Sequence, residues 1–350
     1  MAVNPKAYVC IMAGGSGERF WPMSRQRNPK HLLKLFSDRT LVEETVRRLE
    51  GVVPRENVFV LTNESQLPGT RAALPFLPPG QIIAEPAKRD TAPAAALATG
   101  LVRARDPEAV LALLPADSLI KDAATFSRQL AAALQRAAGD QTLLTFAVKP
   151  TYPATGFGYL EMAEDLGDGF RRVARFVEKP DQQTAARYAA GGNHAWNAGM
   201  FIWRVSAFLA EAERQVPVLA EFIRGFPRED VAAYLAERFP TLPKISVDYA
   251  IMEKATAVAT QLARFDWDDV GTWTALPAHL PMDATGNTIR GPVVTQDADN
   301  NIAISNGRVI ALCGVQNLVV VETPDGILVC HRDAVQDIKK LMPKLPPELL

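Results

Sequence analysis

Glycines and basic residues cluster directly behind the first apolar segment of the chain, in AGGSGERFWPMSR and then PKHLLKL. The glycines are Gly14, Gly15 and Gly17. Arg19 and Lys30 follow them. Glycines at a strand end let backbone N–H groups approach phosphate oxygens closely, and cationic side chains offset phosphate charge. The segment therefore predicts a site for a polyphosphate.

Two familiar phosphate motifs do not fit this segment. The dinucleotide fingerprint needs a glycine where Phe20 stands, and the P-loop needs a Gly-Lys-Ser/Thr run that does not follow. Pro22 and Pro29 disfavour a long helix after the turn, so the chain should stay irregular and fold Arg19 and Lys30 over one ligand. For the bare glycine pattern, a tight turn with solvated basic residues is the alternative.

Carboxylates follow two later strands. Asp117 ends LLPAD, after the strand expected over Val110–Leu114, and ligands of open α/β sheets bind at the carboxyl ends of strands. A turn or helix cap is the alternative role for this aspartate. Glu85 opens EPAKRDTAPA, in which Thr91 is expected to cap an alanine-rich helix with Pro93 in its first turn. A plain helix start with solvated charges is the alternative there.

The elements that must position these residues alternate between strand and helix. Strands are expected over Ala7–Met12, Val58–Leu61, Gln81–Ala84, Val110–Leu114, Leu143–Val148, Gly158–Glu161 and Val173–Glu178. Helices are expected over Thr40–Leu49, Asp90–Arg103, Thr125–Ala138 and within Phe208–Phe239. This order indicates an α/β fold with a mostly parallel sheet and helices on both faces.

The sequence pattern changes near Asn287, after which short runs typical of β-strands alternate with turn residues. The runs are Asn301–Ile304, Arg308–Leu312, Leu318–Glu322 and Gly326–Cys330. A closing helix is expected over Asp333–Leu341. These patterns predict a small β-rich C-terminal domain.

The composition narrows the class of protein. Among 350 residues, 38 lysines and arginines balance 39 acidic residues, which argues against a nucleic-acid binder that relies on bulk charge. We find no signal peptide and no apolar run long enough to span a membrane. Cys10, Cys313 and Cys330 show no metal spacing or pairing pattern, so we expect reduced, buried thiols in a cytoplasmic protein. The four histidines are not spaced for zinc.

The segments AGGSGERFWPMSR and PKHLLKL resemble the signature of the sugar-1-phosphate nucleotidyltransferases, in the form found in bacterial mannose-1-phosphate guanylyltransferases. The resemblance continues in order through most of the chain. It implies a Rossmann-like nucleotidyltransferase domain with a mostly parallel mixed sheet over residues 1–282. Residues 283–350 would form a small β-rich, β-helix-like domain with the closing helix. The implied substrates are GTP and mannose 1-phosphate, and the products are GDP-mannose and pyrophosphate.

The resemblance assigns the nucleotide to the glycine segment and to EPAKRDTAPA. The implied nucleotide-binding residues are Ala13, Gly14, Gly15, Ser16, Gly17, Glu85, Pro86, Arg89 and Thr91. Guanine presents N1–H and an exocyclic amine, and one carboxylate such as that of Glu85 can accept both hydrogen bonds. This would favour guanine over adenine. Asp90 stands where family members usually carry asparagine.

The sugar phosphate is assigned to TGFGYLE, FVEKP and WNAGMFIW, each of which alone could be a strand edge or a hairpin. The implied residues are Gly158, Tyr159, Glu178, Lys179, Asn197 and Gly199. Carboxylate and amide groups suit sugar hydroxyls, and a lysine suits the phosphate. Asp248 and Glu253, in VDYAIMEKA, are expected to give structural support.

The resemblance also implies Mg²⁺, held by Asp117 and by a carboxylate of WDDVGTW. Family members often carry serine where Asp268 stands, so the second ligand role goes to Asp269. Two hard oxygen ligands with phosphates and water suit magnesium. The implied catalytic residues are Arg19, Lys30, Asp117 and Asp269. The tryptophans of WDDVGTW are expected to pack rather than to stack on sugar.

The implied reaction needs no general base, because a phosphate monoester has its second pKa near ~6 and is largely a dianion at neutral pH. Attack on GTP should be direct and in line. The alternatives are a guanylyltransferase for another sugar 1-phosphate and a non-catalytic GDP-sugar-binding regulatory subunit. A nicotinamide-dependent oxidoreductase is disfavoured by Phe20. A homodimer is possible, and no isomerase activity is expected because the chain ends at Leu350.

Overall fold

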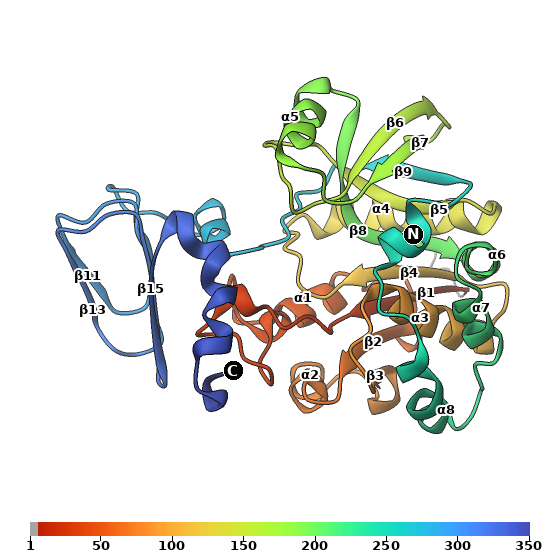
Figure 1. Ribbon diagram of the computed structural model, residues 1–350, viewed down its shortest axis with the longest axis horizontal. Coiled ribbons are helices and arrows are strands. Elements are labelled where there is room, and N and C mark those ends of the chain that lie inside the picture. The colour runs from red at the N-terminus through yellow and green to blue at the C-terminus, as the bar shows by residue number, and fades with distance from the viewer. Residues whose placement is uncertain (1–5) are drawn as a thin grey trace.

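The computed structural model describes residues 6–350. A large α/β part and a small β part lie side by side (Figure 1). The large part contains a sheet with the strand order β3-β2-β1-β4-β8-β5-β9-β7-β6. Its strands are β1 (Ala7–Met12), β2 (Val58–Asn63), β3 (Ile82–Glu85), β4 (Val110–Pro115), β5 (Leu143–Val148), β6 (Tyr159–Asp165), β7 (Phe170–Val177), β8 (His194–Arg204) and β9 (Val258–Leu262).

The sheet is mixed, and its parallel part positions the glycine segment. Strands β3, β2, β1 and β4 are parallel neighbours, and β5 pairs in parallel with β9. The remaining pairings, including β4 with β8, are antiparallel. The carboxyl ends of β1 and β4 therefore meet at one edge, and the amino-terminal half of β8 lies at that same edge.

Helices cover both faces of the sheet, as the sequence predicts. One hydrophobic cluster joins the sheet to α3, α6, α7 and α8, and a second joins it to α1 and α4. The helices are α1 (Leu41–Arg47), α2 (Leu67–Ala73), α3 (Thr91–Arg105), α4 (Ala123–Gly139), α5 (Gln182–Gly191), α6 (Val205–Gln215), α7 (Pro217–Arg224) and α8 (Val231–Arg238). The α/β class is confirmed.

The segment between β1 and α1 stays irregular, which confirms the interpretation of its prolines. Only the short 3-10 turns η1 (Glu18–Phe20) and η2 (Lys30–Leu32) interrupt it. The helix α1 begins where the Thr40 hydroxyl accepts a hydrogen bond from the Glu43 amide at 3.2 Å. The basic residues of the segment are therefore carried on loop and turn, where they can face inward.

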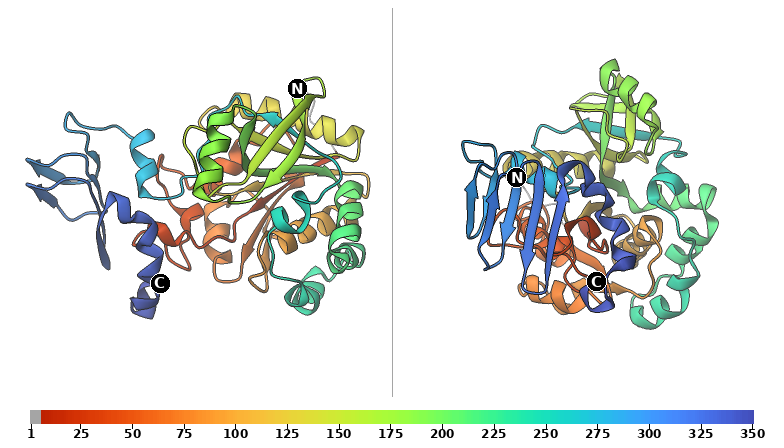
Figure 2. Two further views of the ribbon diagram at one scale, coloured as in Figure 1. Left: turned by 45° about the horizontal axis from the view of Figure 1, so that its top comes forward. Right: turned by 60° about the vertical axis from the view of Figure 1, so that its left-hand side comes forward.

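The small part winds like a β-helix, as the sequence resemblance implies. Strands β10 (Thr288–Arg290), β12 (Ile302–Ser305) and β14 (Leu318–Thr323) stack in parallel, and β15 (Gly326–His331) closes them antiparallel. A second face pairs β11 (Val293–Gln296) with β13 (Ile310–Cys313). Figure 2 shows these strands side by side.

A 3-10 segment, η8 (Arg332–Lys340), follows β15 and takes the place of the closing helix. It lies beside the glycine-rich N-terminal segment (Figure 1). Phe20, Trp21 and Trp273 share one hydrophobic cluster with residues of β12, β14 and η8. The two parts thus have a common core. We propose that the boundary between the two domains lies between residues 282 and 283.

Three local expectations need correction. The cap of α3 is Asp90, whose carboxylate accepts from the Thr91 amide at 2.7 Å, so Thr91 is the first residue of the helix rather than its cap. Cys10 is buried as expected, but Cys313 is exposed and Cys330 is half-buried. Both lie on outer strands of the β-helix-like part, where alternate side chains face solvent.

Candidate active site

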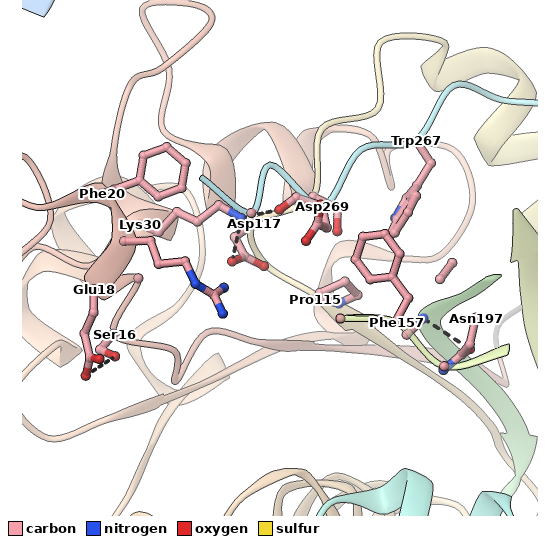
Figure 3. A pocket seen from close by; sticks show the side chains of 18 of the residues that line it. Ser16, Glu18, Phe20, Lys30, Pro115, Asp117, Phe157, Asn197, Trp267 and Asp269 are labelled. Atoms are coloured by element: carbon pink, nitrogen blue, oxygen red, sulfur yellow. Dashed lines mark hydrogen bonds and ion pairs between the residues drawn. The ribbon is translucent and has the colours of Figure 1, made fainter. Parts of the chain in front are cut away.

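A cleft of about 520 Å³ opens at the carboxyl ends of β1 and β4. Figure 3 shows side chains that line it. The cleft contains many residues that the sequence resemblance assigns to the site: Ser16, Gly17, Arg19, Lys30, Asp117, Gly158, Glu178, Asn197, Gly199 and Asp269. These residues come from segments far apart in the chain. The fold therefore brings the glycine segment, both aspartates and the expected sugar residues to one place.

Gly17 shapes the loop by letting another segment pass close to it. Its φ is +64°, and a Cβ at this position would lie 2.4 Å from the Lys30 Cβ and 2.9 Å from the Lys30 amide nitrogen. Only glycine fits both the conformation and the space. At Gly14 and Gly15, by contrast, a Cβ would meet nothing within 4 Å. The missing side chains at those two positions leave open space in front of β1, as close approach of a phosphate requires.

Lys30 joins three segments of the cleft. Its ammonium lies 3.0 Å from the Asp117 carboxylate and 2.5 Å from the backbone oxygen of Asp269 (Figure 3). The lysine is buried, with 6% of its surface exposed. Burial of a paired ammonium fixes its position, so a positive charge is held between the ends of β1 and β4.

Arg19 lines the same cleft but has no partner there. Within residues 6–350 its guanidinium has no hydrogen bond or ion pair, and its Nε is buried without a partner. A half-buried, unpaired guanidinium is costly unless an anion completes it. Arg19 is therefore prepared for an anionic ligand.

Asp117 and Asp269 form the acidic part of the cleft. Burial is the main cause that raises the pKa of Asp269 to about 6; Lys30 and Arg19 lower it, while Asp268 and Asp117 raise it. Carboxylates crowded in this way are stabilised by a divalent cation, and their oxygens suit magnesium. No group of three or more histidine, cysteine or acidic side chains in residues 6–350 could hold a metal. Phosphates and water would have to complete the coordination.

The Asp268 carboxylate contacts Val270 and His279 and does not line the cleft with Asp117 and Asp269. One carboxylate oxygen accepts from the Val270 amide at 2.7 Å, and the other contacts His279 Nε2 at 2.7 Å. Its backbone pairs with Leu119, two residues after Asp117. These contacts support Asp269 rather than Asp268 as the carboxylate that serves the cleft.

The far wall of the cleft is polar and rigidly held. The Asn197 Oδ1 accepts from the Thr145 hydroxyl at 2.7 Å, and its Nδ2 donates to Asp248 at 3.2 Å. The Glu178 amide donates to Glu253 at 2.8 Å, so Glu253 gives the support that the sequence predicts. Closely placed carboxylate and amide groups of this kind suit a polyol.

Two expected sugar-site residues do not line the cleft. Tyr159 is fully buried, with its ring 5.5 Å from that of Tyr188. Lys179 is paired with the Glu178 carboxylate at 2.6 Å. Both adjoin residues that do line the cleft, and their part in ligand binding stays a prediction.

The expected base-binding residues lie to one side, at the end of β3 and the start of α3. Strand β3 is two positions from β1 in the sheet, so these residues are roughly 10 Å from the glycine segment. Burial raises the pKa of Glu85 to about 8. The Arg89 guanidinium donates to the Pro240 carbonyl, and the Thr91 hydroxyl accepts from the Val247 amide at 2.9 Å.

The remaining residues of this group differ in exposure. Ala13 is buried and extends the pairing of β1 with β2, since its amide donates to the Leu61 carbonyl at 2.7 Å. Pro86 is half-buried. None of the residues from Glu85 to Thr91 lines the cleft itself, so their contact with a base stays a prediction.

Comparisons with known proteins identify the family to which this chain belongs. The family model described as nucleotidyl transferase matches residues 8–284, most of the chain. The chain belongs to the nucleotidyl transferase family. A second model, described as a MannoseP isomerase/GMP-like beta-helix domain, matches residues 291–345, in agreement with the winding of the small part.

Similar proteins match nearly the whole chain. The mannose-1-phosphate guanylyltransferase of Escherichia coli is 35% identical over 339 residues, which are 94% of this chain and 72% of that protein. The alginate biosynthesis protein AlgA of Pseudomonas putida is 37% identical over 351 residues, 96% of this chain and 70% of that protein. A crystal structure named mannose-1-phosphate geranyltransferase, from Thermus thermophilus, has a TM-score of 0.88 at 34% identity, covering 97% and 99% of the two chains.

Some residues of this nucleotidyl transferase cleft were missed by sequence reasoning. Asp248, expected only as support, lines the cleft, and burial followed by the charge of Glu178 raises its pKa to about 7. Trp267 also lines it and contacts Phe157 edge-on at 5.5 Å, whereas Trp273 is buried as expected. An aspartate within the apolar run VDYAIM was the signal that could have identified Asp248.

Lys339 also lines the cleft, from the C-terminal part. No motif in the sequence signals it.

In residues 6–350 no helix combines the length and the apolar character needed to cross a bilayer.

Proposed function

We propose that this chain transfers GMP from GTP to mannose 1-phosphate, forming GDP-mannose and pyrophosphate. The observation that carries the proposal is one cleft with two unlike walls. The first wall combines Ser16 and Gly17 of the glycine segment, an unpaired Arg19 and the buried Lys30. The second offers Glu178 and Asn197 to a polyol. The names of the relatives from Escherichia coli and Thermus thermophilus agree with mannose 1-phosphate as a substrate.

In this reaction a phosphate oxygen of the sugar phosphate attacks the α-phosphorus of GTP, and the bond to the departing pyrophosphate breaks. The nucleophile is already a dianion, because its second pKa is near ~6. The residues of the cleft therefore need to align two anions and offset their repulsion, and none needs to remove a proton. Lys30 would hold the α-phosphate, and Arg19 the departing phosphates.

Asp117 and Asp269 would hold Mg²⁺, which when bound supplies positive charge shared by the phosphates of both substrates. Burial is the main cause that raises the pKa of Asp269, and the charges of Asp268 and Asp117 raise it further, which supports a cation at this place. Without a cation, the two carboxylates would repel the phosphates that Arg19 and Lys30 attract, so the acidic pair suits this reaction only when a metal balances its charge.

Guanine selection is assigned to Glu85. Its buried carboxyl can accept hydrogen bonds from N1–H and the exocyclic amine of guanine, whereas adenine offers an unprotonated N1 there. Because the pKa of Glu85 is about 8 in the free chain, binding in this way would release a proton at neutral pH.

Another sugar 1-phosphate is the nearest alternative, since hydroxyl-binding groups such as Glu178 and Asn197 do not identify an epimer. The name of the Thermus thermophilus protein refers instead to a geranyl group. An apolar isoprenyl chain would desolvate Arg19, Lys30 and the acidic residues of this cleft without pairing them. The charged lining therefore favours the guanylyl reaction.

Release of pyrophosphate from a matrix of substrates tests the proposal. GTP, ATP, UTP and dTTP are each paired with mannose, glucose and fucose 1-phosphates, with Mg²⁺ and with EDTA. We expect magnesium-dependent release with GTP and mannose 1-phosphate. Release with GTP and a different sugar would overturn the sugar assignment. Binding of GTP without release for any pair would favour a regulatory subunit.

The homodimer and the cytoplasmic location stay predictions. Sedimentation equilibrium of the purified chain measures the first: a mass near twice 38.1 kDa supports it, and a mass near 38.1 kDa contradicts it.

A further inference from the structure

Lys339 reaches the catalytic cleft from the C-terminal domain. It is one of the lining residues, although it lies in η8, after all the β-helix-like strands. The turn η1, which carries Arg19, packs against η8. Figure 1 shows this C-terminal segment beside the N-terminal loops. Lys339 therefore lies at the end of the cleft that carries Arg19.

The backbone around Lys339 is fixed by its neighbours. Ile338 is 1% exposed and Val335 is 4% exposed, and both pack in the cluster that contains Phe20 and Trp21. Phe20 directly follows Arg19, so the same cluster sets the positions of both cations. Lys339 itself is exposed, and only its flexible side chain has to move to meet a ligand.

Lys339 and Lys340 are adjacent in the chain but differ in their side-chain contacts. Lys340 lies 2.7 Å from the Asp337 carboxylate and does not line the cleft. Within the described part of the chain, Lys339 forms no hydrogen bond or ion pair through its side chain. Lys30, the remaining lysine of the lining, is already paired with Asp117.

Arg19 and Lys339 are thus the unpaired cations of the cleft lining in residues 6–350. Glu18 directly precedes Arg19, and its carboxylate accepts from the Ser16 hydroxyl at 3.2 Å. Asp337, two residues before Lys339, is paired with Lys340. Two unpaired cations at one end of a cleft fit a ligand with several negative charges better than they fit a neutral sugar.

We propose that Lys339 binds the pyrophosphate leaving group together with Arg19. This inference rests on the proposed guanylyl transfer. When the bond between the α-phosphorus and the bridging oxygen breaks, negative charge grows on the departing pyrophosphate, and a cation placed there stabilises it. Lys339 is then a leaving-group-binding residue, and the C-terminal domain completes the active site.

Calorimetric titration of the full chain with inorganic pyrophosphate and Mg²⁺ tests the inference. Lys339→Ala should weaken binding about tenfold, the effect of losing one charge-assisted contact. Lys340→Ala is the matched control and should bind as the wild type does. Lys339→Arg should recover most of the affinity because it restores the charge. Thermal melting checks that the variants fold, and Lys339→Gln is the second charge-removing variant.

Kinetics separate this role from a structural one. Lys339→Ala should raise the KM for pyrophosphate in the reverse reaction and leave the KM for GDP-mannose unchanged. Wild-type affinity for pyrophosphate in both Lys339→Ala and Lys339→Gln would overturn the inference, as would an equal loss in Lys340→Ala. If pyrophosphate binding depends on Lys339 but no guanylyl transfer occurs, the inference stands and the proposed function fails.

Discussion

Lys30 connects three segments that form the cleft. It contacts Asp117 after β4 and the backbone of Asp269 after β9, while Gly17 makes room for its backbone. Its buried charge is therefore placed by three segments at once. Preorganised charge of this kind is worth more in catalysis than a flexible surface cation.

Lys30→Ala should lower kcat by about 10²–10³ while the circular dichroism spectrum stays that of the wild type. The reason is the loss of the positive charge beside the attacked phosphate. Lys34→Ala, on the exposed side of the same segment, is the control and should keep normal turnover. An unchanged kcat in Lys30→Ala would remove this residue from the mechanism.

Burial of the Asp269 carboxylate lowers the stability of the folded chain at neutral pH. Its pKa is raised from 3.8 to about 6, mainly by burial. Between these pH values the folded chain holds a proton that the unfolded chain has released, so stability falls as the pH rises through this window. Above about pH 6 the whole cost of the buried charge is present.

Asp269→Asn should therefore raise the free energy of unfolding at pH 7.5 by about 1–2 kcal/mol, measured in urea with EDTA. It should also remove the contribution of this group to the pH dependence between about 4 and 6, and abolish most turnover. Asp38→Asn, at an exposed site, should change neither. A destabilised Asp269→Asn with normal activity would contradict this account.

At the scale of elements, the parallel strands bring the segments that line the cleft to one edge. Their apolar runs made β1 and β5 predictable to the residue, because strands buried on both faces appear as continuous hydrophobic segments. The long strand β8 was recognised only through its sugar motif. It pairs with β4, β5 and β6, and such long-range pairing leaves no local pattern.

The glycine loop gives a prediction that separates structure from ligand binding. Gly17→Ala should lower the melting temperature and turnover, because its Cβ would collide with Lys30 and its φ is +64°. Gly15→Ala should leave the melting temperature unchanged, since a Cβ there meets nothing, but it should raise the KM for GTP. Thermal melting and steady-state kinetics measure both. Equal destabilisation by the two substitutions would contradict the roles given to them.

At the scale of the whole molecule, the C-terminal part packs against the segment that carries Arg19. Its strands share a hydrophobic cluster with Phe20 and Trp273, and Arg25 pairs with Asp325 at 2.9 Å. The short runs and turns of the sequence predicted a small β-rich domain, and the family resemblance implied its β-helix-like winding. The sequence did not predict this contact, because residues so far apart in the chain meet only through the fold. Lys339 was missed for the same reason.

Ile338→Ala should cost about 2–4 kcal/mol of stability, because it leaves a cavity in this shared cluster. Since the cluster positions Phe20 and Arg19, turnover with GTP should fall as well, at temperatures where the variant is still folded. Val329→Ala, at a site that is 62% exposed on β15, is the control and should be nearly neutral. A destabilised Ile338→Ala with wild-type kinetics would mean that the C-terminal part is only an attached domain.

In the proposed reaction, GMP passes directly between two ligands held in one cleft. Exchange of labelled pyrophosphate into GTP, measured with and without mannose 1-phosphate, tests it most directly. We expect exchange only when the sugar phosphate is present, and no label on the protein after reaction with α-labelled GTP. Exchange without the sugar phosphate, or a guanylylated protein, would contradict it.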